Sequence, residues 1–530
     1  MEFLLRRDGS PHGPCFSRAR NDLKDMTPVA NLTCSKPADA AFAIPFDNTY
    51  ARLPEAFYER VIPATAPSPK LLRVNEALAR QLRIDPEFLK TSAGLAILSG
   101  NTIAPGSEPI AQAYAGHQFG NFVPQLGDGR ALLLGEVVDV EGKRYDLQLK
   151  GSGPTRFSRR GDGRAALGPV IREYILNEAM AALGIPTTRS LAAVLTGENV
   201  MRERVLPGCI LTRVASSHLR VGTFQYFAAR GDTENLRILA DYAIARHYPD
   251  ARGAEEPYLA FYDAVVASLA RLSARWMLIG FIHGVLNTDN TSIAGETIDY
   301  GPCAFMDAYH PDKVFSSIDQ FGRYAFANQP AVIKWNLARF AETLLPLIAD
   351  GAGKAIEAAN ASIARFNEHY ERAYISGLRQ KLGLTLEAED DLELGADLLA
   401  RMAENQADFT LTFRALSEAA ADSERDADLR ALFLNPAAFD EWAKRWRDRL
   451  SGEDQSAEVR RAQMLTVNPI FIPRNHRIEA AIADAEAGRF DKFNELVEVL
   501  AHPYDGQPEF VEYAKPPAPE EEVQQTFCGT

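Results

Sequence analysis

The 530-residue sequence contains little cysteine. Its five cysteines are widely separated and form no C-x-x-C pair, which excludes a disulfide-stabilised scaffold and argues against a structural zinc site: Cys15, Cys34, Cys209, Cys303 and Cys528. Their scarcity is typical of a protein from a reducing compartment. We therefore expect a cytoplasmic protein.

The sequence also has fewer positive than negative residues, and it lacks long apolar runs. The chain has 57 Lys and Arg against 71 Asp and Glu, a net charge of −14, which argues against general binding to nucleic acid or to an anionic membrane. No window has the roughly 18 consecutive apolar residues of a membrane span, and Met1–Arg7 lacks the apolar core of a signal peptide. With 46% apolar and 24% charged residues, the composition is that of an ordinary globular protein.

The chain divides into four parts by pattern. Residues 1–40 have no periodicity and are expected to be a disordered leader, and 511–530, rich in Pro and Glu, a disordered tail. Between them, 41–225 is expected to be a nucleotide-binding region and 226–510 a mostly helical one. Strands first and helices afterwards predict an α+β fold. The helices expected outside the motifs below include 71–82, 87–93, 332–348, 355–382, 392–417 and 440–450.

A glycine-rich turn precedes a predicted hairpin. Ala131–Val140 and Arg144–Lys150 are β-rich runs around a three-residue turn that contains Gly142, and Gly127-Asp128-Gly129-Arg130 comes before the first of them. A glycine turn before a strand, followed by a lysine on the next strand, is how protein kinases cover a nucleotide's phosphates. G-x-G alone is usually only a turn, so Lys150 at the end of the hairpin gives the motif its weight.

A basic loop and a helix follow Lys150. Arg156, Arg159, Arg160 and Asp162-Gly163-Arg164 form either a solvated loop, an RNA-binding segment or, beside a nucleotide pocket, a phosphate-binding loop. The predicted helix over residues 171–183 offers Glu173 or Glu178 as a partner for Lys150. We favour Glu173, which is nearer the helix start; a solvent-facing glutamate is the alternative.

Two further arginines accompany the next predicted strands, over residues 187–196 and 203–215. Arg213 lies in the second strand and Arg220 follows seven residues later. Residues 223–270 are mostly helical, and a buried helix over 264–282 leads into the sequence HGVLNTDN.

That sequence and the residues after it are typical of a magnesium–nucleotide site. Asn290 and Asp299 lie on short loops joined by a predicted hairpin (residues 291–298), and their oxygens are ligands that Mg²⁺ prefers. His283 and Asn290 stand at the two ends of the kinase pattern H-R-D-x-x-x-x-N. Val285 occupies the position of the kinase base, and an acidic residue reappears at Asp289.

Several motifs together resemble the selenoprotein O family, also called the YdiU family. The resemblance runs from about Phe42 to Phe493 and is carried by LQLKGSGPTRFSRRGDGRAAL, IREYILNEAMAALGIPTTR, LTRVASSHLRVGTFQYFA, HGVLNTDNTSIAGETIDYGPCAFMD and NPIFIPRNHRIEAA. It implies a two-lobed, protein-kinase-like fold with a large helical C-terminal region that binds ATP in a flipped orientation. It also implies transfer of AMP to protein hydroxyls of Ser, Thr or Tyr, with Mg²⁺ or Mn²⁺ as cofactor, and uridylyl transfer with Mn²⁺ as a variant.

The resemblance also assigns roles to individual residues. It implies that Asn290 and Asp299 bind the metal, that Lys150 contacts phosphate while paired with Glu173, and that Asp289 is the general base, with a structural role as the alternative. The residues implied to contact the nucleotide are Gly127, Gly129, Arg130, Lys150, Asp162, Gly163, Arg213, Arg220 and Asp299. In the family, redox control is proposed for the C-terminal residue; here Cys528 would hold that role, with Cys303 as a partner thiol.

Three functions remain to be weighed. The first is a protein adenylyltransferase that takes ATP and protein substrates, works as a monomer and has no nucleic-acid or membrane partner. The second is a conventional protein kinase, which Val285 disfavours because the usual base is missing. The third is a nucleotide-binding pseudokinase scaffold, which the retained Lys150 and metal ligands disfavour.

Overall fold

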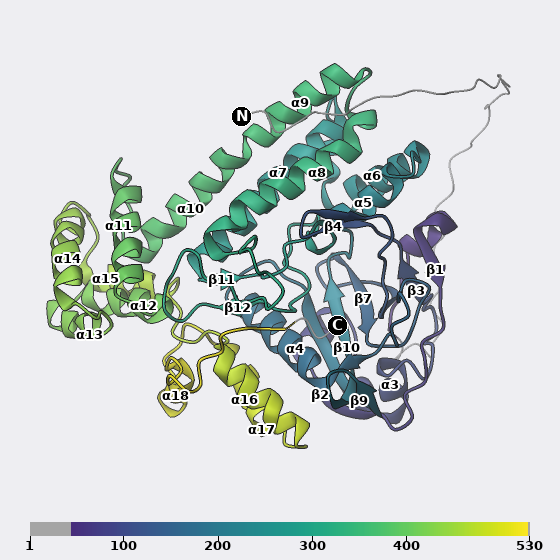
Figure 1. Ribbon diagram of the computed structural model, residues 1–530, viewed down its shortest axis with the longest axis horizontal. Coiled ribbons are helices and arrows are strands. Elements are labelled where there is room, and N and C mark those ends of the chain that lie inside the picture. The colour runs from purple at the N-terminus through teal and green to yellow at the C-terminus, as the bar shows by residue number, and fades with distance from the viewer. Residues whose placement is uncertain (1–43, 528–530) are drawn as a thin grey trace. The chain divides into compact units, whose positions relative to one another are not determined.

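An antiparallel sheet occupies the first half of the chain in the computed structural model, which describes residues 44–527 (Figure 1). The strands follow one another across the sheet in the order β1-β3-β6-β7-β10-β9-β2, and β8 pairs with β10. Their bounds are β1 Tyr58–Arg60, β2 Lys70–Val74, β3 Ile110–Gln112, β6 Ala131–Val138, β7 Arg144–Lys150, β8 Ala165–Ala166, β9 Arg189–Met201 and β10 Val205–Ala215.

The register of the central strands places Lys150 between two neighbours. Lys150 on β7 is opposite Ala131 on β6 and Leu211 on β10, and Arg213 on β10 is opposite Gln148. The predicted β6–β7 hairpin is therefore present, and Gly142 makes its turn with a φ of 83°. In this way the pairing of β7 with β10, which are more than 50 residues apart in sequence, brings Lys150 and Arg213 together.

Helices near the start of the chain cover one side of the sheet. They are α1 Glu76–Gln81, α2 Pro86–Lys90 and α3 Ser92–Leu98. The prediction of one helix over 71–82 is wrong in its first part, because Leu71 to Val74 belong to β2 and pair with β9. The helix begins only after Asn75, whose side-chain oxygen accepts a hydrogen bond from the Leu78 amide.

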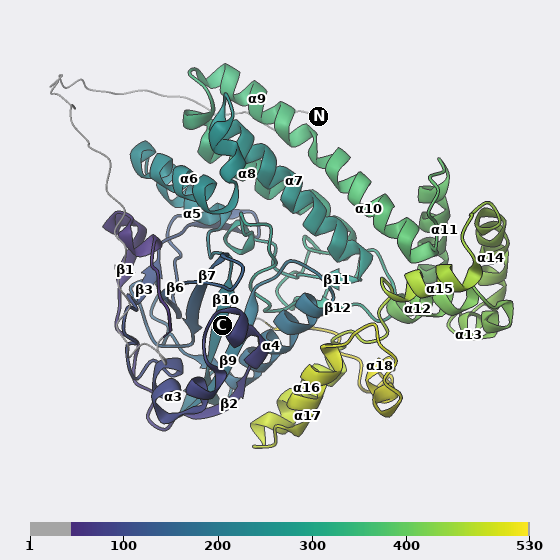
Figure 2. The same cartoon turned by 180° about the vertical axis from the view of Figure 1, so that it is seen from behind.

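Helix α4 (Leu167–Ala182) is buried between the sheet and two C-terminal helices. It packs on β9 and β10, and it also packs against α16 (Asn475–Glu486) and α17 (Asp491–Leu500) (Figure 2). Helix α4 begins at Leu167, before the predicted start at residue 171. Its Glu173 is buried and does not face solvent.

Helices make up most of the second half, which confirms the α+β prediction. The long helix α7 packs against both α8 and α10 (Figure 1). Phe261 of α7 and Phe340 of α8 also pack on Phe224 of α5. The predicted helices over 355–382 and 392–417 are each interrupted, the second because Asp408 caps a new helix through the Leu411 amide. The bounds are α5 Val221–Ala228, α6 Thr233–His247, α7 Pro257–Leu278, α8 Gln329–Ile348, α9 Ala352–Ala364, α10 Phe366–Leu382, α11 Asp391–Glu404, α12 Phe409–Ala419, α13 Asp426–Arg430, α14 Pro436–Leu450, α15 Ala457–Leu465 and α18 Val511–Ala514.

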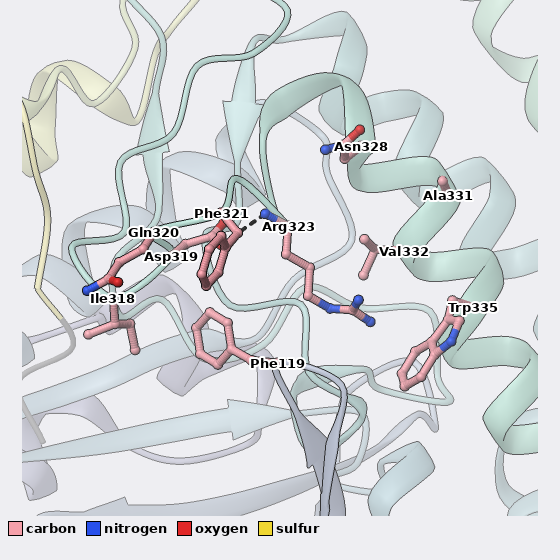
Figure 3. A pocket seen from close by; sticks show the side chains of 10 residues that line it. All are labelled: Phe119, Ile318, Asp319, Gln320, Phe321, Arg323, Asn328, Ala331, Val332 and Trp335. Carbon is pink, nitrogen blue, oxygen red and sulfur yellow. Dashed lines mark hydrogen bonds between the residues drawn. The ribbon is translucent and has the colours of Figure 1, made fainter.

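The segment after α7 is mostly irregular. Two short strand pairs border it, β11 (Phe281–Ile282) with β12 (Ala304–Phe305), and β4 (Gly116–Gln118) with β5 (Asn121–Val123). The hairpin predicted over 291–298 is wrong: Ser292 pairs with Arg220 and Thr297 with Thr187, so this segment bonds to the sheet region instead of to itself. Further on, the loop after β12 borders a pocket against α8 (Figure 3).

The C-terminal segment is held against the same region. The predicted disorder over 511–530 is corrected for 511–527, because α18 forms and Thr526 pairs with Ser316. The Thr526 hydroxyl also donates to the carbonyl of Pro302. The predicted leader and Cys528 lie outside the described residues. Within residues 44–527, no helix is both long and apolar enough to cross a membrane.

Candidate active site

Four charged side chains form a buried cluster beside the end of β7. Lys150 Nζ lies 2.6 Å from Glu173 Oε2 and 3.2 Å from Asp299 Oδ1. Arg213 lies 2.6 Å from the other oxygen of Glu173 and 3.5 Å from Asp299 Oδ1. The sheet, α4 and the loop after α7 thus each contribute to one cluster. Glu178, the alternative partner for Lys150, pairs with Arg189 instead.

Both carboxylates of this cluster are held in the ionised form. Burial alone would raise the pKa of Asp299, but Lys150, Arg213 and Arg130 outweigh it and hold that pKa far below its usual value. Burial likewise opposes ionisation of Glu173, and Arg213 and Lys150 lower its pKa overall. At neutral pH the two carboxylates are therefore charged, and they hold the cations in position before any ligand binds.

Arg220 extends the positive charge away from this cluster. Its guanidinium lies 3.6 Å from Asp128 Oδ1 and stacks 4.3 Å from the ring centre of Tyr114. Gln148 donates to Asp128 Oδ2 (3.2 Å) and accepts from Arg213 (3.4 Å), so it joins the two arginine sites. The glycine turn that holds Asp128 is in this way tied to the arginines of the sheet.

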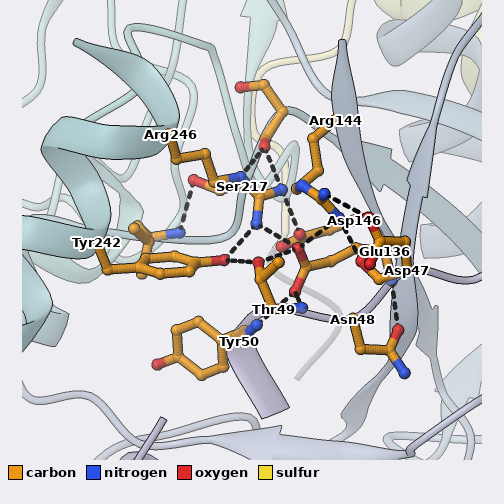
Figure 4. Close-up of polar contacts among 12 residues, drawn as sticks. Asp47, Asn48, Thr49, Tyr50, Glu136, Arg144, Asp146, Ser217, Tyr242 and Arg246 are labelled. Atoms are coloured by element: carbon orange, nitrogen blue, oxygen red, sulfur yellow. Dashed lines mark hydrogen bonds and ion pairs between the residues drawn. The ribbon is translucent and has the colours of Figure 1, made fainter. Parts of the chain in front are cut away.

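A second buried network fixes the segment that carries Arg220 (Figure 4). Arg246 on α6 lies 2.6 Å from Asp146 and 3.2 Å from Glu136, and its Nε donates to the carbonyl of Ser216. Asp146 Oδ2 in turn accepts from the amide of His218. Because these contacts hold residues 216–218 from both sides, they set where the chain places Arg220, two residues later.

The glycine-rich turn and the basic loop pack on each other. Gly127 and Gly129 both lie against Phe157 of the loop. Gly163 has a φ of 67°, and a Cβ there would overlap the carbonyl of Gly153, so only glycine fits without rearrangement. Asp162 lies apart from the buried cluster, in an ion pair with Arg202 (2.8 Å).

Asp289 lies in a short 3-10 turn, Thr288–Asn290, with backbone close on two sides. A Cβ at Gly116 would run into the Asp289 side chain, and a Cβ at Gly222 would overlap the carbonyl of Ala115 and lie 3.3 Å from Asp289 Cα. Asp289 Oδ2 accepts from Gln118 Nε2 (3.1 Å), whereas Oδ1 is buried and has no hydrogen-bond partner among the described residues. Burial raises the pKa of Asp289 to about 6.

The residues predicted to bind a metal offer oxygen atoms, the ligand type that a hard cation prefers. Asn290 donates its side-chain amide nitrogen to the carbonyl of Val285 (3.1 Å), which leaves its oxygen as the ligand atom. Asp299 has a left-handed backbone, φ 67°, that aims its carboxylate at Lys150. Over residues 44–527 no set of three His, Cys, Asp or Glu side chains could hold a metal unaided. A carboxylate and an amide oxygen are the sparse protein ligands that Mg²⁺ combines with phosphates.

The structure therefore joins Lys150, Glu173, Arg213 and Asp299 directly, and ties Arg220 to them through Gln148 and Asp128. Sequence reasoning missed Gln148, Asp146 and Tyr114. The first two had a signal, because side chains two and four residues before Lys150 share its face of a strand. Cys303 is fully buried, and burial raises the pKa of its thiol.

Comparison with known proteins gives a consistent result. Residues 41–501 match the family model described as protein adenylyltransferase SelO. The chain is 81% identical over 505 residues to the protein nucleotidyltransferase YdiU of Nitrobacter hamburgensis, covering 95% of this chain and all of that protein. It is 78% identical over 505 residues to the protein of the same name from Nitrobacter winogradskyi, with the same coverage. The protein of that name from Bradyrhizobium diazoefficiens is 61% identical over 487 residues, which cover 92% of this chain and 99% of the relative.

Proposed function

We propose a function from one premise: the chain belongs to the protein adenylyltransferase SelO family, and is a nucleotidyltransferase. We propose that it transfers AMP from ATP to Ser, Thr or Tyr hydroxyls of other proteins and releases pyrophosphate. The observation that carries this proposal is the distribution of charge in the site.

The cations of the site converge on one buried region. Lys150 and Arg213 share the carboxylates of Glu173 and Asp299, and Arg220 stands beside them on a fixed segment. A triphosphate brings several negative charges, which arginine forks and lysine can bind. We propose that the β- and γ-phosphates enter this region, so that the α-phosphate faces Asp289.

Asp289 is proposed as the general base. Its Oδ1, which has no hydrogen-bond partner within residues 44–527, can accept a proton from the acceptor hydroxyl. The hydroxyl oxygen then bonds to the α-phosphorus, the bond from that phosphorus to the bridging oxygen breaks, and pyrophosphate leaves. The proton stays on Asp289 until solvent removes it. The pKa of about 6 leaves most of this side chain ionised at neutral pH.

Asn290 and Asp299 would hold the divalent cation, Mg²⁺ or Mn²⁺. When bound, the ion neutralises charge on the phosphates. Asp299 itself does more than bind metal, because its contact with Lys150 fixes the lysine beside the phosphate region.

We also propose a kinase-like division of the chain. Residues 41–225 would be the nucleotide-binding lobe and 226–510 the helical lobe that carries Asp289 and Asn290. The buried Lys150–Glu173 pair between strand and helix supports this comparison, since kinases position their lysine in the same way. The proposed partners are ATP and hydroxyl-bearing proteins, bound by a cytoplasmic monomer.

The test uses ATP labelled with ³²P at either the α- or the γ-position. The protein is incubated with each nucleotide, Mg²⁺ or Mn²⁺ and a heat-inactivated cell lysate, and protein-bound label is measured after electrophoresis. We expect label from the α-position only. Label from the γ-position only would indicate a conventional kinase, and label from neither would indicate a nucleotide-binding scaffold.

A further inference from the structure

A pocket of about 490 Å³ lies beside the loop that carries Asp289 (Figure 3). Its walls come from three elements: Phe119 after β4, the loop that contains Ile318, Phe321 and Arg323, and Trp335 on α8. In Figure 3 the guanidinium of Arg323 reaches into the space between Phe119 and Trp335. None of these residues is part of the site described above.

The wall of the pocket is hydrogen-bonded to the proposed catalytic loop. The amide of Phe119 donates to Asn287 Oδ1 (3.0 Å), and the preceding residue, Gln118, is the hydrogen-bond partner of Asp289. Tyr324, next to Arg323, donates its hydroxyl to the same Asn287 oxygen (2.6 Å). A molecule seated in the pocket would therefore contact Phe119 and Arg323, whose chain segments are hydrogen-bonded to the loop of Asp289.

The pocket wall combines large apolar side chains with one cation, Arg323, and also includes the polar side chains of Asp319, Gln320 and Asn328. Phe321 is 96% exposed and Ile318 57% exposed, a degree that is unusual for such large apolar side chains. Arg323 lies 4.8 Å from the ring centre of Trp335, and among the described residues no carboxylate oxygen lies within 4.0 Å of its guanidinium nitrogens.

The acid in the pocket wall does not neutralise Arg323. Asp319 accepts hydrogen bonds from the backbone amides of Arg323 (2.9 Å) and Tyr324 (2.8 Å), which occupy one oxygen each. In addition, Arg323 Nε is buried and lacks a hydrogen-bond partner among the described residues. A buried donor without a partner is costly, so a bound carboxylate would supply what the protein leaves out.

We propose that this pocket binds the acceptor segment of the protein substrate, through a bulky apolar side chain that is next to a Glu or Asp. The aromatic and aliphatic walls would take the apolar side chain, and Arg323 would pair with the carboxylate. The proposal rests on the proposed function and specifies its substrate class. A nucleobase between Arg323 and Trp335 is the competing occupant, and the test separates the two.

The probe is a set of peptide pools with a central Ser, Thr or Tyr. In each pool one flanking position is fixed as acidic, basic, aromatic or small, and the full chain transfers label from α-³²P ATP. We expect the wild type to label the best acidic pool and the best aromatic pool about tenfold more than the basic or small pools at that position, the scale of one close charge pair or one anchor residue.

Two pocket variants and one control sharpen the test. Arg323→Glu should reverse the charge preference from acidic to basic, and Trp335→Ala should remove the aromatic preference, both with the KM for ATP within about twofold of wild type. Lys334→Glu makes the same charge change on α8, but Lys334 contacts Asn367 and does not line the pocket. We expect it to keep the wild-type preferences.

The outcomes distinguish the proposals. Wild-type labelling without any flanking preference, or preferences that Arg323→Glu leaves unchanged, would overturn the docking proposal and leave AMP transfer standing. A large rise in the KM for ATP in both pocket variants, with unchanged peptide preference, would overturn it in favour of a nucleobase site. Absence of α-label in every pool and in lysate proteins would overturn the proposed function itself, and the docking proposal with it.

Discussion

Asp299 contacts both cations of the buried cluster. Its carboxylate contacts Lys150 and Arg213, and its left-handed φ of 67° is a conformation that asparagine tolerates but alanine resists. Asp299→Asn is therefore the variant to test, because it removes the charge of the side chain and keeps its shape. We expect α-label transfer to fall by about 100-fold, the scale of one preorganised electrostatic group.

The control for Asp299→Asn is the thermal unfolding temperature. We expect it to fall but to stay above the assay temperature, because Lys150 and Arg213 lose one of their two carboxylate partners while the backbone conformation is kept. A variant that is folded and fully active would contradict both the metal and the lysine-positioning roles of Asp299.

Asp289 gives a second test at the scale of one residue. Asp289→Asn removes the proton acceptor but keeps a group of the same size beside Gln118. We expect kcat to fall between about 100- and 10,000-fold, the range for loss of a general base, with the KM for ATP nearly unchanged. Gln118→Leu removes the hydrogen bond alone and is the matched control. If the two variants lose the same amount of activity, Asp289 is a positioning residue.

At the scale of single residues, the sequence indicated which residues lie in the charged cluster more often than it indicated which residue each one contacts. Lys150 and Glu173 are recognisable because a strand-ending lysine and an early helix glutamate follow a known pattern. The family resemblance places Asp162 beside the nucleotide, yet in the structure Asp162 pairs with Arg202. The contact depends on which strands become neighbours, and no local pattern in the loop encodes that.

Elements were predictable where their signal is local. The β6–β7 hairpin follows from alternating apolar residues around a glycine turn, and it forms as expected. The hairpin expected over 291–298 fails because its backbone groups find partners at Arg220 and Thr187, more than 70 residues away. The same cause turns Leu71–Val74 into a strand, since β9 offers a partner that the sequence pattern does not reveal.

The packing of α10 on α12 contains a buried lysine. Lys381 has 4% of its surface exposed and lies 4.3 Å from the ring centre of Phe413, and burial lowers its pKa to about 7. In the unfolded chain the Lys381 amine is protonated below about pH 10.5, whereas in the folded chain it is protonated only below about pH 7. The residue therefore costs stability, most of all below pH 7, and the cost disappears as the pH rises to 10.5.

Lys381→Met should accordingly stabilise the protein. We expect the free energy of unfolding to rise by about 3 kcal/mol at pH 8, and the gain to fall below about 1 kcal/mol at pH 10, from 1.36 kcal/mol per pH unit. Urea unfolding of both proteins at the two pH values measures the difference. The exposed Lys354→Met serves as control, and a gain that is the same at both pH values would contradict the explanation.

At the scale of the whole molecule, Arg474 ties the C-terminal helices to the segment after the site. Its fully buried guanidinium pairs with Asp307 after β12 and with Asp408 at the start of α12 (2.8 Å). Arg474→Met would leave the buried carboxylate of Asp408 and the partly buried one of Asp307 without their cation, so we expect it to cost about 3–5 kcal/mol of the free energy of unfolding.

A matched substitution is available nearby. Arg489→Met breaks an ion pair with Asp484 in which the arginine side chain is 61% exposed, and should cost less than about 1 kcal/mol. Chemical denaturation of the two variants gives both values. Equal, small losses would mean that the buried arginine is not what connects these parts of the chain.

The central claim is that the arginine cluster holds the triphosphate with its terminal phosphates inside and the α-phosphate toward Asp289. A crystal structure with α,β-methylene ATP and Mg²⁺ tests it most directly. We predict that the γ-phosphate contacts Lys150, Arg213 or Arg220 and that the α-phosphorus lies nearest Asp289. A γ-phosphate pointing toward Asp289, with Arg213 and Arg220 making no phosphate contact, would contradict the account.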